Sequence, residues 1–510
     1  MTVAELVVEL EAAGLRCLPG PVPDLSVLGI GHDSRTIGPG EVFVALPGRH
    51  NQGSEFAGQA LASGAVAVLA GQGSGVDAGN GWPVVYVDDV LTAAGVAAAA
   101  VYRRPAERMK LVGVTGTNGK TTVTYLLESI WRSAGVEAGV LGTIALRCPA
   151  FERPAPMTTL AAVDLQRTLG QMADSGCTAA ALEVSSHGLT QKRVAGCSFA
   201  AAVFTNLSRD HLDYHGDEAS YFAAKCSLFS AYLDPAGAAV VNADDPRASE
   251  ILAAAGTAEA WTYSTTAPAR VSVLEFHESL EGTRADVDID GEVVDVRLGL
   301  LGRVNLSNAL AAAAAASATG ISTHDIVDGL GSCAPVPGRL ERVGGTEPRV
   351  IVDYAHTPDA LDKTLGSLRS ATEGRIIVVF GCGGDRDRGK RSEMGAVADA
   401  LSDVTVLTSD NPRSEDPDTI IGDIEAGLAT KPRLSTEELS GPAGTGYMVE
   451  PDRRRAITAA LAVAGPGDLV VVAGKGHEDY QELGAGYRVP FDDRAVIEEL
   501  VGSAPRRERP

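Results

Sequence analysis

LVGVTGTNGKTT, residues 111–122, joins an apolar strand-like run to a helical pattern that continues through Leu126 and Ile130. Glycines in such a turn let backbone N–H groups approach an anion, and the dipole of the following helix favours negative charge. Lys120 can reach the outer phosphates of a nucleotide, and a threonine hydroxyl can ligate magnesium. Val114 stands where the strict Walker pattern has its first glycine. The strand–loop–helix context nevertheless favours a phosphate loop over an ordinary glycine-rich turn with an exposed lysine.

Strand-like apolar runs alternate with helical stretches on both sides of this loop, which predicts α/β domains with largely parallel sheets. A chain of 510 residues is too long for one ordinary core and is expected to form about three domains. We expect a smaller N-terminal α/β domain over 1–105, a central domain over 106–335 with a P-loop-type parallel sheet and flanking helices, and a C-terminal Rossmann-like α/β domain over 336–510. The segment 102–105 is interpreted as a linker. The expected strands are 41–46, 65–70, 111–115, 179–184, 201–205, 238–242, 350–353, 376–380, 404–408 and 469–473.

Composition and charge exclude several classes of protein. The chain is 45% hydrophobic and 21% charged, as expected of packed globular domains, and its formal net charge of −23 would repel nucleic acid and anionic membranes. No apolar run is long enough to span a membrane, and residues 1–10 lack a basic signal region. Seven cysteines without a C-x-x-C pair indicate reduced, mostly buried thiols. We expect a cytoplasmic monomer with no nucleic-acid partner and no membrane insertion.

Glu183 and His211 follow two strand-like segments that we take to be neighbours in the central sheet. They are expected to meet beside the phosphate loop, where Thr121 would be a third ligand of magnesium. Taken alone, Glu183 is typical of a helix N-cap and His211 of a structural histidine. Lys225 lies in an otherwise apolar helical stretch, where an ammonium is costly unless it is paired or chemically changed. The alternative is a lysine that extends to the surface.

Several blocks resemble the Mur ligases and their folylpolyglutamate synthetase relatives, and together they cover nearly the whole chain. The phosphate loop GTNGKTT is similar to the ATP loop of these enzymes, and the blocks downstream are similar in wording and order to the Mur ligases in particular. These blocks are EVSSHGL at 183–189, TNLSRDHLDYHG at 205–216, NLSN at 305–308, GR at 338–339, DYAHTP at 353–358, GCGGDRDRGKR at 381–391, DNPR at 410–413 and GKGHE at 474–478.

The resemblance implies that ATP and Mg²⁺ are bound between the central and third domains. Its implied catalytic residues are Lys120, His211 and Lys225, with Lys225 carrying a carbamate. Asn305 would otherwise be a helix cap and Arg339 a surface charge. The implied ATP contacts are Gly116, Thr117, Asn118, Gly119, Lys120, Thr121, Thr122, Asn305, Arg339, Asp353 and His356, and the implied metal partners are Thr121, Glu183, His211 and Lys225.

The resemblance further implies that UDP-N-acetylmuramoyl-L-alanyl-D-glutamate is the acceptor. Ser34 and the turn at 48–53 are similar to the uridine-binding end, although Gln52 stands where relatives often have Asp. Polar groups and one Arg in the central domain would suit the muramoyl peptide and its carboxylate. The implied contacts are Ser34, Thr158, Thr159, Ser185, Gln191 and Arg193.

The tetrad Asp410-Asn411-Pro412-Arg413 resembles the type of Mur ligase that adds meso-diaminopimelate to the D-glutamate residue through an acyl phosphate. Arg413 offers a planar fork for the second carboxylate of this amino acid. The alternatives are a plain turn after a strand, addition of L-lysine, folylpolyglutamate synthesis, or a nucleotide-gated interaction protein that makes no bond. The implied diaminopimelate contacts are Arg391, Asp410, Asn411, Arg413, Gly474 and Glu478.

Overall fold

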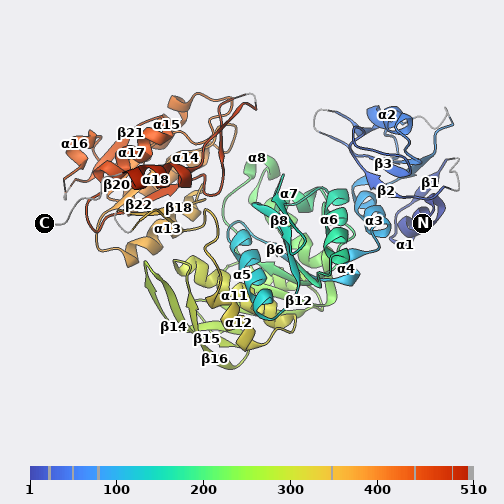
Figure 1. Ribbon diagram of the computed structural model, residues 1–510, viewed down its shortest axis with the longest axis horizontal. Helices are drawn as coiled ribbons and strands as arrows, with labels where there is room; N and C mark the ends of the chain where they lie inside the picture. The colour runs from blue at the N-terminus through green and yellow to red at the C-terminus, as the bar shows by residue number, and fades with distance from the viewer. Residues whose placement is uncertain are drawn as a thin grey trace.

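In the computed structural model, the chain folds into three domains, each built around one main β-sheet (Figure 1). The structure describes residues 1–20, 25–48, 51–76, 81–345, 348–441, 444–484 and 486–503. The N-terminal and C-terminal domains stand at opposite ends of the central domain, with α8 (Leu212–His215) at the edge of the central domain between them. Each main sheet lies inside one of the three ranges expected from the sequence. In the part of the chain described, no helix is both long enough and apolar enough to cross a membrane.

The N-terminal domain has a five-stranded sheet in the order β1-β5-β4-β3-β2, parallel except for β1. Its strands are β1 (Cys17–Pro19), β2 (Gly29–Gly31), β3 (Glu41–Ala45), β4 (Ala67–Gly71) and β5 (Val84–Val87). Its helices are α1 (Val3–Ala12), α2 (Ala57–Ala62) and α3 (Val90–Val101), with a 3₁₀ turn at Gly53–Phe56. A capping box between Thr2 and Glu5 starts α1.

Residues 102–105, the segment interpreted as a linker, form a tight corner between the first sheet and the central domain. Arg103 and Arg104 both have positive φ, 61° and 48°, and α4 (Pro105–Arg108) begins directly after them. Arg103 forms an ion pair with Asp174, and Arg104 forms one with Glu9. Charged side chains on both sides therefore hold the corner in place.

The central domain contains eleven strands in the order β16-β15-β14-β13-β12-β11-β6-β10-β7-β8-β9. The seven strands at the centre of this order, β14-β13-β12-β11-β6-β10-β7, are parallel, as expected. Antiparallel strands extend the sheet at both edges: β15 and β16 at one, β8 and β9 at the other. At one edge Asp290 and Gly291 both have positive φ, the conformation of a two-residue hairpin turn. The strands are β6 (Lys110–Thr115), β7 (Ala138–Leu141), β8 (Ala145–Cys148), β9 (Phe151–Pro154), β10 (Ala179–Glu183), β11 (Phe199–Phe204), β12 (Leu233–Asn242), β13 (Glu259–Ser264), β14 (Val271–Ser279), β15 (Gly282–Ile289) and β16 (Glu292–Leu298).

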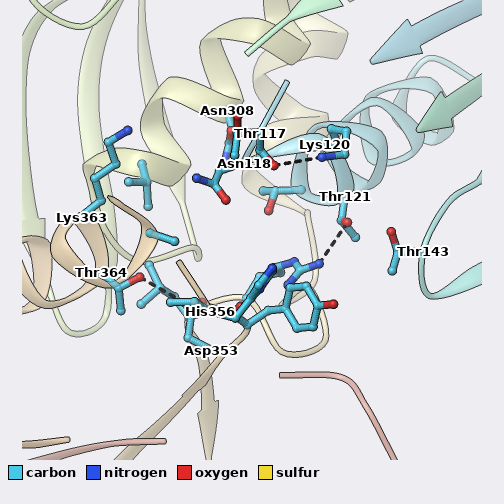
Figure 2. A pocket seen from close by; sticks show the side chains of 18 of the residues that line it. Thr117, Asn118, Lys120, Thr121, Thr143, Asn308, Asp353, His356, Lys363 and Thr364 are labelled. Carbon is cyan, nitrogen blue, oxygen red and sulfur yellow. Dashed lines mark hydrogen bonds between the residues drawn. The ribbon is translucent and has the colours of Figure 1, made fainter. Parts of the chain in front are cut away.

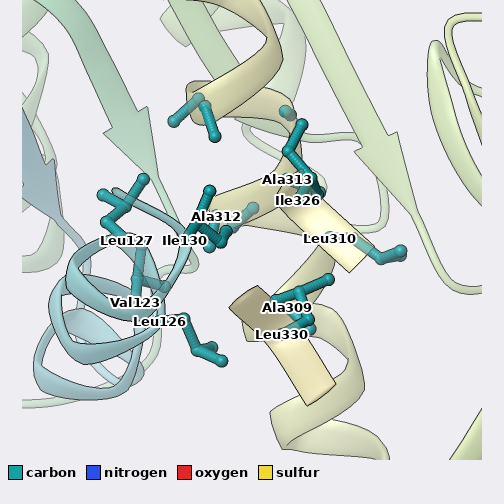
Figure 3. Packing of buried hydrophobic residues seen from close by; sticks show 14 of the residues in the cluster. Val123, Leu126, Leu127, Ile130, Ala309, Leu310, Ala312, Ala313, Ile326 and Leu330 are labelled. Atoms are coloured by element: carbon teal, nitrogen blue, oxygen red, sulfur yellow. The ribbon is translucent and has the colours of Figure 1, made fainter. Parts of the chain in front are cut away.

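Small residues allow the helices of this domain to pack closely on the sheet. The alanine-rich α11 (Arg303–Ala318) and α12 (Thr323–Gly331) face α5 (Lys120–Ser133), whose Ile130 points toward them (Figure 3). A Cβ on Gly329 would lie 2.3 Å from the Cα of Ile130. This packing fixes the helix that carries the phosphate loop. The remaining helices are α6 (Ala162–Asp174), α7 (Ser186–Thr190), α9 (Glu218–Ser227) and α10 (Ala248–Ala254), and a π turn at Leu228–Tyr232 follows α9.

The C-terminal domain has a six-stranded sheet in the order β17-β18-β22-β19-β20-β21, parallel except for β17. Its strands are β17 (Glu341–Val343), β18 (Arg349–Asp353), β19 (Ile376–Phe380), β20 (Val404–Leu407), β21 (Gly446–Val449) and β22 (Leu469–Ala473), and β23 (Tyr480–Glu482) pairs with β24 (Arg488–Pro490). Its helices are α13 (Pro358–Ala371), α14 (Gly389–Leu401), α15 (Pro417–Glu425), α16 (Thr436–Leu439), α17 (Arg453–Val463) and α18 (Asp493–Ser503). Helices lie on both faces, as expected of a Rossmann-like domain.

Candidate functional site

Two glycines give the phosphate loop a backbone conformation that other residues rarely adopt. Gly116 has φ of 147° and Gly119 has φ of 92°, and a Cβ on Gly116 would lie 1.9 Å from the Oγ1 of Thr205. The Nζ of Lys120 donates to the carbonyl oxygens of Gly116 at 2.9 Å and Thr117 at 3.0 Å. Backbone N–H groups, a helix N-terminus and an ammonium therefore converge on one turn, which fits a nucleotide phosphate.

Residues that follow β11, the neighbour of β6 in the sheet, hold the phosphate loop from the side. The backbone N–H of Asn118 donates to the Oδ1 of Asn206 at 3.0 Å, and the hydroxyl of Thr205 donates to the carbonyl of Asn118 at 2.6 Å. Asp245, on the loop after β12, accepts from the backbone N–H of Leu207 at 2.8 Å. Asn206 and Asp245 are positioning residues that the sequence analysis missed, because only the folded sheet brings their loops together.

A cavity of about 240 Å³ lies between this loop and the C-terminal domain (Figure 2). Among the expected ATP contacts, all but Gly116 line it. Arg339 crosses the domain boundary: its guanidinium donates to the Oγ1 of Thr121 at 3.2 Å and lies over the ring of Tyr354. Asn305 is a buried residue inside α11 and not a helix cap, and its amide donates to the carbonyl of Leu301. These contacts join two domains around one cavity.

Asp353 and His356 occupy the wall of this cavity that the third domain supplies. The carboxylate of Asp353 accepts from the backbone N–H groups of Leu340 and Ala355, and burial raises its pKa. The Nδ1 of His356 lies 2.8 Å from the carbonyl oxygen of Tyr354, and burial lowers the pKa of this imidazole. Asp353 therefore ties the interdomain segment to the sheet as well as lining the cavity.

Glu183 ends β10 with a buried carboxylate beside the phosphate loop. It accepts from the backbone N–H of Thr143 at 2.8 Å and from the hydroxyls of Thr143 and Thr121 at 3.0 Å each. The hydroxyl of Ser185 caps α7, so Glu183 is not an N-cap residue. The expectation that Glu183 and His211 follow neighbouring strands is wrong, because β6 lies between β10 and β11 in the sheet. Both side chains still line the cavity, one on each side of the strand that leads into the loop.

His211 is held in a left-handed backbone conformation at the start of α8, with φ of 55°. Its backbone N–H donates to Asp210, and its Nε2 lies 3.4 Å from a carboxylate oxygen of the same residue. Burial lowers the pKa of His211 to about 3 although Asp210 acts in the opposite direction. A neutral imidazole at this place has a free electron pair for a metal ion.

Lys225 is buried in α9, with 1% of its surface exposed, so it does not extend into solvent. Its Nζ lies 4.3 Å from the ring centre of Tyr221, whose hydroxyl pairs with that of Thr117 in the phosphate loop at 3.1 Å. Burial, reinforced by the charge of Lys120, lowers the pKa of Lys225 well below its ordinary value. A neutral amine is the form that reacts with carbon dioxide. The described residues contain no group of three or more His, Cys, Asp or Glu suited to a metal, so a metal ion here would depend on this mixed set of ligands.

A second cavity, of about 830 Å³, opens between the N-terminal and central domains. Gln191, Arg193 and His211 line it together with Gly48 of the N-terminal domain and Arg386 of the C-terminal domain. The guanidinium of Arg193 donates to Gln191 and to the carbonyl of Thr159, while Thr158 and Ser185 line the first cavity. His211 lines both cavities, so a substrate in the second can reach the phosphate loop.

Ser34 lies apart from the other expected substrate contacts. Its buried hydroxyl donates to the Oε1 of Gln59 at 3.1 Å within the N-terminal domain, and it lines neither cavity. Of the turn at 48–53, residues 49 and 50 lie outside the described part of the chain. The uridine-binding assignment therefore stays a prediction.

Four of the expected amino-acid contacts gather where β20 and β22 end. The amide of Asn411 donates to Glu478 at 2.9 Å, and a Cβ on Gly474 would lie 2.5 Å from the Oδ2 of Asp410. Gly474 has φ of 111°, so both its conformation and the approach of Asp410 require glycine. Arg413 lies beside them, with its guanidinium donating to the carbonyl of Gly384 at 2.7 Å.

Arg391 departs from its expected place. The motif suggested a substrate carboxylate as its partner, but its side chain is fully buried and already pairs with Glu415 at 2.8 Å and Asp423 at 2.9 Å. From its position on α14, the side chain of Arg391 points into the interior of the domain, where it holds the loop that carries Glu415. Arg386, five residues earlier, is exposed and lines the second cavity. The sequence signal for Arg386 was present in the same GGDRDRGKR block, but the block does not say which arginine points outward.

Fold and site together define a three-domain α/β protein that binds a nucleotide on a phosphate loop at a domain boundary. Family models match residues 26–112 (Mur ligase family, catalytic domain), 114–316 (Mur ligase middle domain) and 338–476 (Mur ligase, glutamate ligase domain). The chain belongs to the Mur ligase family of ATP-dependent, amide-bond-forming ligases.

Individual relatives are similar along almost the whole chain. UDP-N-acetylmuramoyl-L-alanyl-D-glutamate–2,6-diaminopimelate ligases from Gloeobacter violaceus and Geobacter metallireducens are 46% and 44% identical, over 96% and 93% of this chain and 96% and 94% of theirs. A solved structure of a ligase of the same name is 36% identical, with a TM-score of 0.66 over 93% of this chain and 95% of its own. The MurF ligase of Thermotoga maritima in complex with ADP, 18% identical over 94% of this chain and 97% of its own, shares the fold with a TM-score of 0.64.

Proposed function

We propose that this protein joins meso-diaminopimelate to the D-glutamate residue of UDP-N-acetylmuramoyl-L-alanyl-D-glutamate at the expense of ATP, a step in peptidoglycan precursor synthesis. The observation that carries the proposal is the shared wall of the two cavities at His211, which lets a long acceptor in one meet a nucleotide in the other. The names of the most similar relatives support the same pair of substrates. Seven free thiols and the need for ATP support action in the cytoplasm, and we expect a monomer.

The chemistry follows from the poor reactivity of a carboxylate toward amines. An oxygen of the D-glutamate side-chain carboxylate attacks the γ-phosphorus of ATP, and ADP leaves, so that an acyl phosphate forms. The amine of diaminopimelate then attacks the acyl carbon, and phosphate departs with the former carboxylate oxygen. Phosphoryl transfer of this kind depends mainly on positioning and on stabilisation of negative charge.

The phosphate loop and its neighbours supply that stabilisation. The Nζ of Lys120, now on two loop carbonyls, lies within reach of a γ-phosphate. Glu183, Thr121 and His211 would hold Mg²⁺, which neutralises phosphate charge when bound. The buried carboxylate of Glu183 and the hydroxyl of Thr121 are oxygen ligands that suit this ion, and His211 lines the same cavity. A carbamate on Lys225 would change a buried amine into an anion and add a further oxygen ligand.

Recognition of diaminopimelate falls to the cluster at the ends of β20 and β22. Arg413 would bind the far carboxylate and Glu478 the far ammonium, with Asn411 bonded to Glu478. Arg386 is a further exposed cation at the second cavity and could bind a carboxylate of the acceptor or of diaminopimelate. Lysine lacks the far carboxylate, so it would leave the guanidinium of Arg413 with only its contacts to Gly384 and Glu482.

The test follows one oxygen atom. The acceptor is prepared with ¹⁸O in the side-chain carboxylate of D-glutamate and incubated with ATP and diaminopimelate, and the released phosphate is analysed by mass spectrometry. The proposal predicts one ¹⁸O in each phosphate, and no release when either carbon substrate is left out. Unlabelled phosphate, or release that needs only ATP, would overturn it. Lys120→Ala is expected to abolish release in a folded protein.

A further inference from the structure

A buried lysine that the proposed mechanism does not use lies at the centre of the amino-acid cluster. Lys475 follows β22, and none of its side-chain surface is exposed. Its Nζ lies 3.2 Å from the Oε2 of Glu478, 3.3 Å from the Oδ1 of Asn411 and 4.0 Å from the Oδ1 of Asp410. An ammonium with no access to solvent is stable only with such partners, so these contacts decide where the neighbouring groups point.

Lys475 and the backbone N–H of Glu482 together fix the orientation of the Asn411 amide. The Oδ1 of Asn411 accepts from Lys475 and from the backbone N–H of Glu482 at 2.9 Å. The Nδ2 must then face the opposite way, where it donates to Glu478 at 2.9 Å. Both atoms of the amide are therefore assigned by their partners, and Glu478 receives two donors on the same oxygen, Oε2. Among the described residues, no donor is bonded to the other oxygen of Glu478, which leaves it for a ligand.

The charges of the cluster favour one further cation. Asp410 and Glu478 face the single ammonium of Lys475, and the neighbouring Arg413 lies 3.5 Å from the carboxylate of Glu482, so one negative charge of the cluster is in excess. The nearby Arg453 is fully buried and already neutralised by Asp493, which accepts from it at 2.7 and 2.8 Å. Incoming ammonium would balance the excess charge without a second protein cation.

The charge state of Glu478 depends on these neighbours. Burial and Asp410 raise the pKa of Glu478, while Lys475 and Asn411 lower it. Tyr354 and Tyr480 also face the carboxylate, and burial raises the pKa of both phenols, so they add no negative charge near neutrality. Removal of Lys475 would leave two facing carboxylates, and Glu478 would then keep a proton to higher pH.

We propose that Lys475 is a positioning residue that sets specificity: it holds Glu478 and Asn411 so that one carboxylate oxygen of Glu478 receives the far ammonium of the incoming diamino acid. The inference rests on the proposed function, because it assumes that this cluster binds the far end of diaminopimelate. It adds that recognition of the far amine requires a buried lysine that never touches the substrate's reacting atoms.

The experiment compares diaminopimelate with 2-aminopimelate, which has the same chain and both carboxylates but lacks the far amine. The ratio of kcat/KM for the two compounds is measured from pH 6.5 to 9 for the wild type and for Lys475→Met. Lys431→Met is the matched control, since Lys431 is another buried lysine of this domain whose Nζ donates to Ala398 and Ser402, away from the cluster. Lys475→Gln, which is shorter but keeps two N–H donors without the charge, serves if the Met variant does not fold.

We expect the wild type and the control to prefer diaminopimelate by about 10- to 100-fold at every pH, the range of a charge-assisted hydrogen bond. Lys475→Met should lose most of this preference at pH 6.5 and regain part of it as Glu478 is deprotonated at higher pH, while the KM for ATP stays unchanged. The inference is overturned if the variant keeps the wild-type ratio, or shows a stronger preference, across the range. A wild type that does not distinguish the two compounds would instead refute the assignment of the pocket, and the inference with it.

Discussion

Glu183→Gln tests whether the buried carboxylate beside the phosphate loop binds a metal ion or only supports the fold. Glu183 accepts three hydrogen bonds, from the backbone N–H and hydroxyl of Thr143 and from the hydroxyl of Thr121. A glutamine has nearly the same shape but only one acceptor oxygen. The backbone N–H of Thr143 cannot reorient and would keep its hydrogen bond to that oxygen. The hydroxyls of Thr143 and Thr121 would rotate to accept from the new NH₂ group.

The structural cost of this change is modest. Three bonds to a charged acceptor become bonds between neutral groups, and each such change removes about 1 kcal/mol. We therefore expect a loss of about 2–3 kcal/mol in the free energy of unfolding. The effect on metal binding is expected to be larger, because the site loses its anionic ligand: even residues one step removed from a metal change affinity by about 10- to 100-fold. The magnesium concentration for half-maximal phosphate release should rise by about 100-fold.

Phosphate release is measured against magnesium concentration for the wild type, Glu183→Gln and a control, Glu128→Gln. Glu128 is also a largely buried carboxylate of the central domain, paired with Arg147. The control should lose comparable stability in thermal unfolding and keep the magnesium requirement of the wild type. If both variants need the same magnesium concentration as the wild type, Glu183 is a structural residue and the metal assignment is wrong.

Three further outcomes follow from the site. Lys225→Ala should be nearly inactive and partly rescued by short-chain carboxylic acids that occupy the place of the carbamate; full activity without rescue, or a lysine that stays unmodified by mass spectrometry under carbon dioxide, would contradict this. Arg413→Ala should raise the KM for diaminopimelate and reduce the ratio of kcat/KM for diaminopimelate over lysine, with little change in the KM for ATP. An unchanged ratio in competition assays would show that another group binds the far carboxylate. Arg209→Ala removes the ion pairs that join the central domain to Asp387 at 3.1 Å and to Glu393 at 2.9 Å, so the variant should compact less than the wild type in small-angle scattering when an ATP analogue and the acceptor are added. Equal compaction would show that these ion pairs do not contribute to domain closure.

The sequence predicted best those features that depend on local patterns. The phosphate loop was recognisable because strand, glycines and helix are contiguous, and two of its glycines have positive φ in the structure. The apolar neighbours of Lys225 on a helix left burial or extension to the surface open, and the structure has the side chain buried. The hairpin at Asp290-Gly291 also had a local signal, but the parallel pattern of the preceding strands hid it.

Features that depend on the order of strands or the direction of side chains could not be predicted in this way. Nothing in the chain order says that β6 lies between β10 and β11, since parallel strands are joined by crossovers that can pass over a neighbour. Within one motif, Arg386 faces a cavity and Arg391 faces the interior, and this choice is made by the start of α14 and by the carboxylates that surround it. Asp245 acts on a loop far away in the sequence, through a contact that exists only in the folded sheet.

The most direct test of the proposed activity is the identity of the product. Purified protein is incubated with ATP, Mg²⁺, UDP-N-acetylmuramoyl-L-alanyl-D-glutamate and either meso-diaminopimelate or L-lysine, each in equal excess, and the nucleotide products are analysed by mass spectrometry. We predict the diaminopimelate adduct, one ADP for each adduct formed, and at most a trace of the lysine adduct. A lysine adduct formed as readily as the diaminopimelate adduct, or ATP consumed with neither adduct formed, would contradict the proposal.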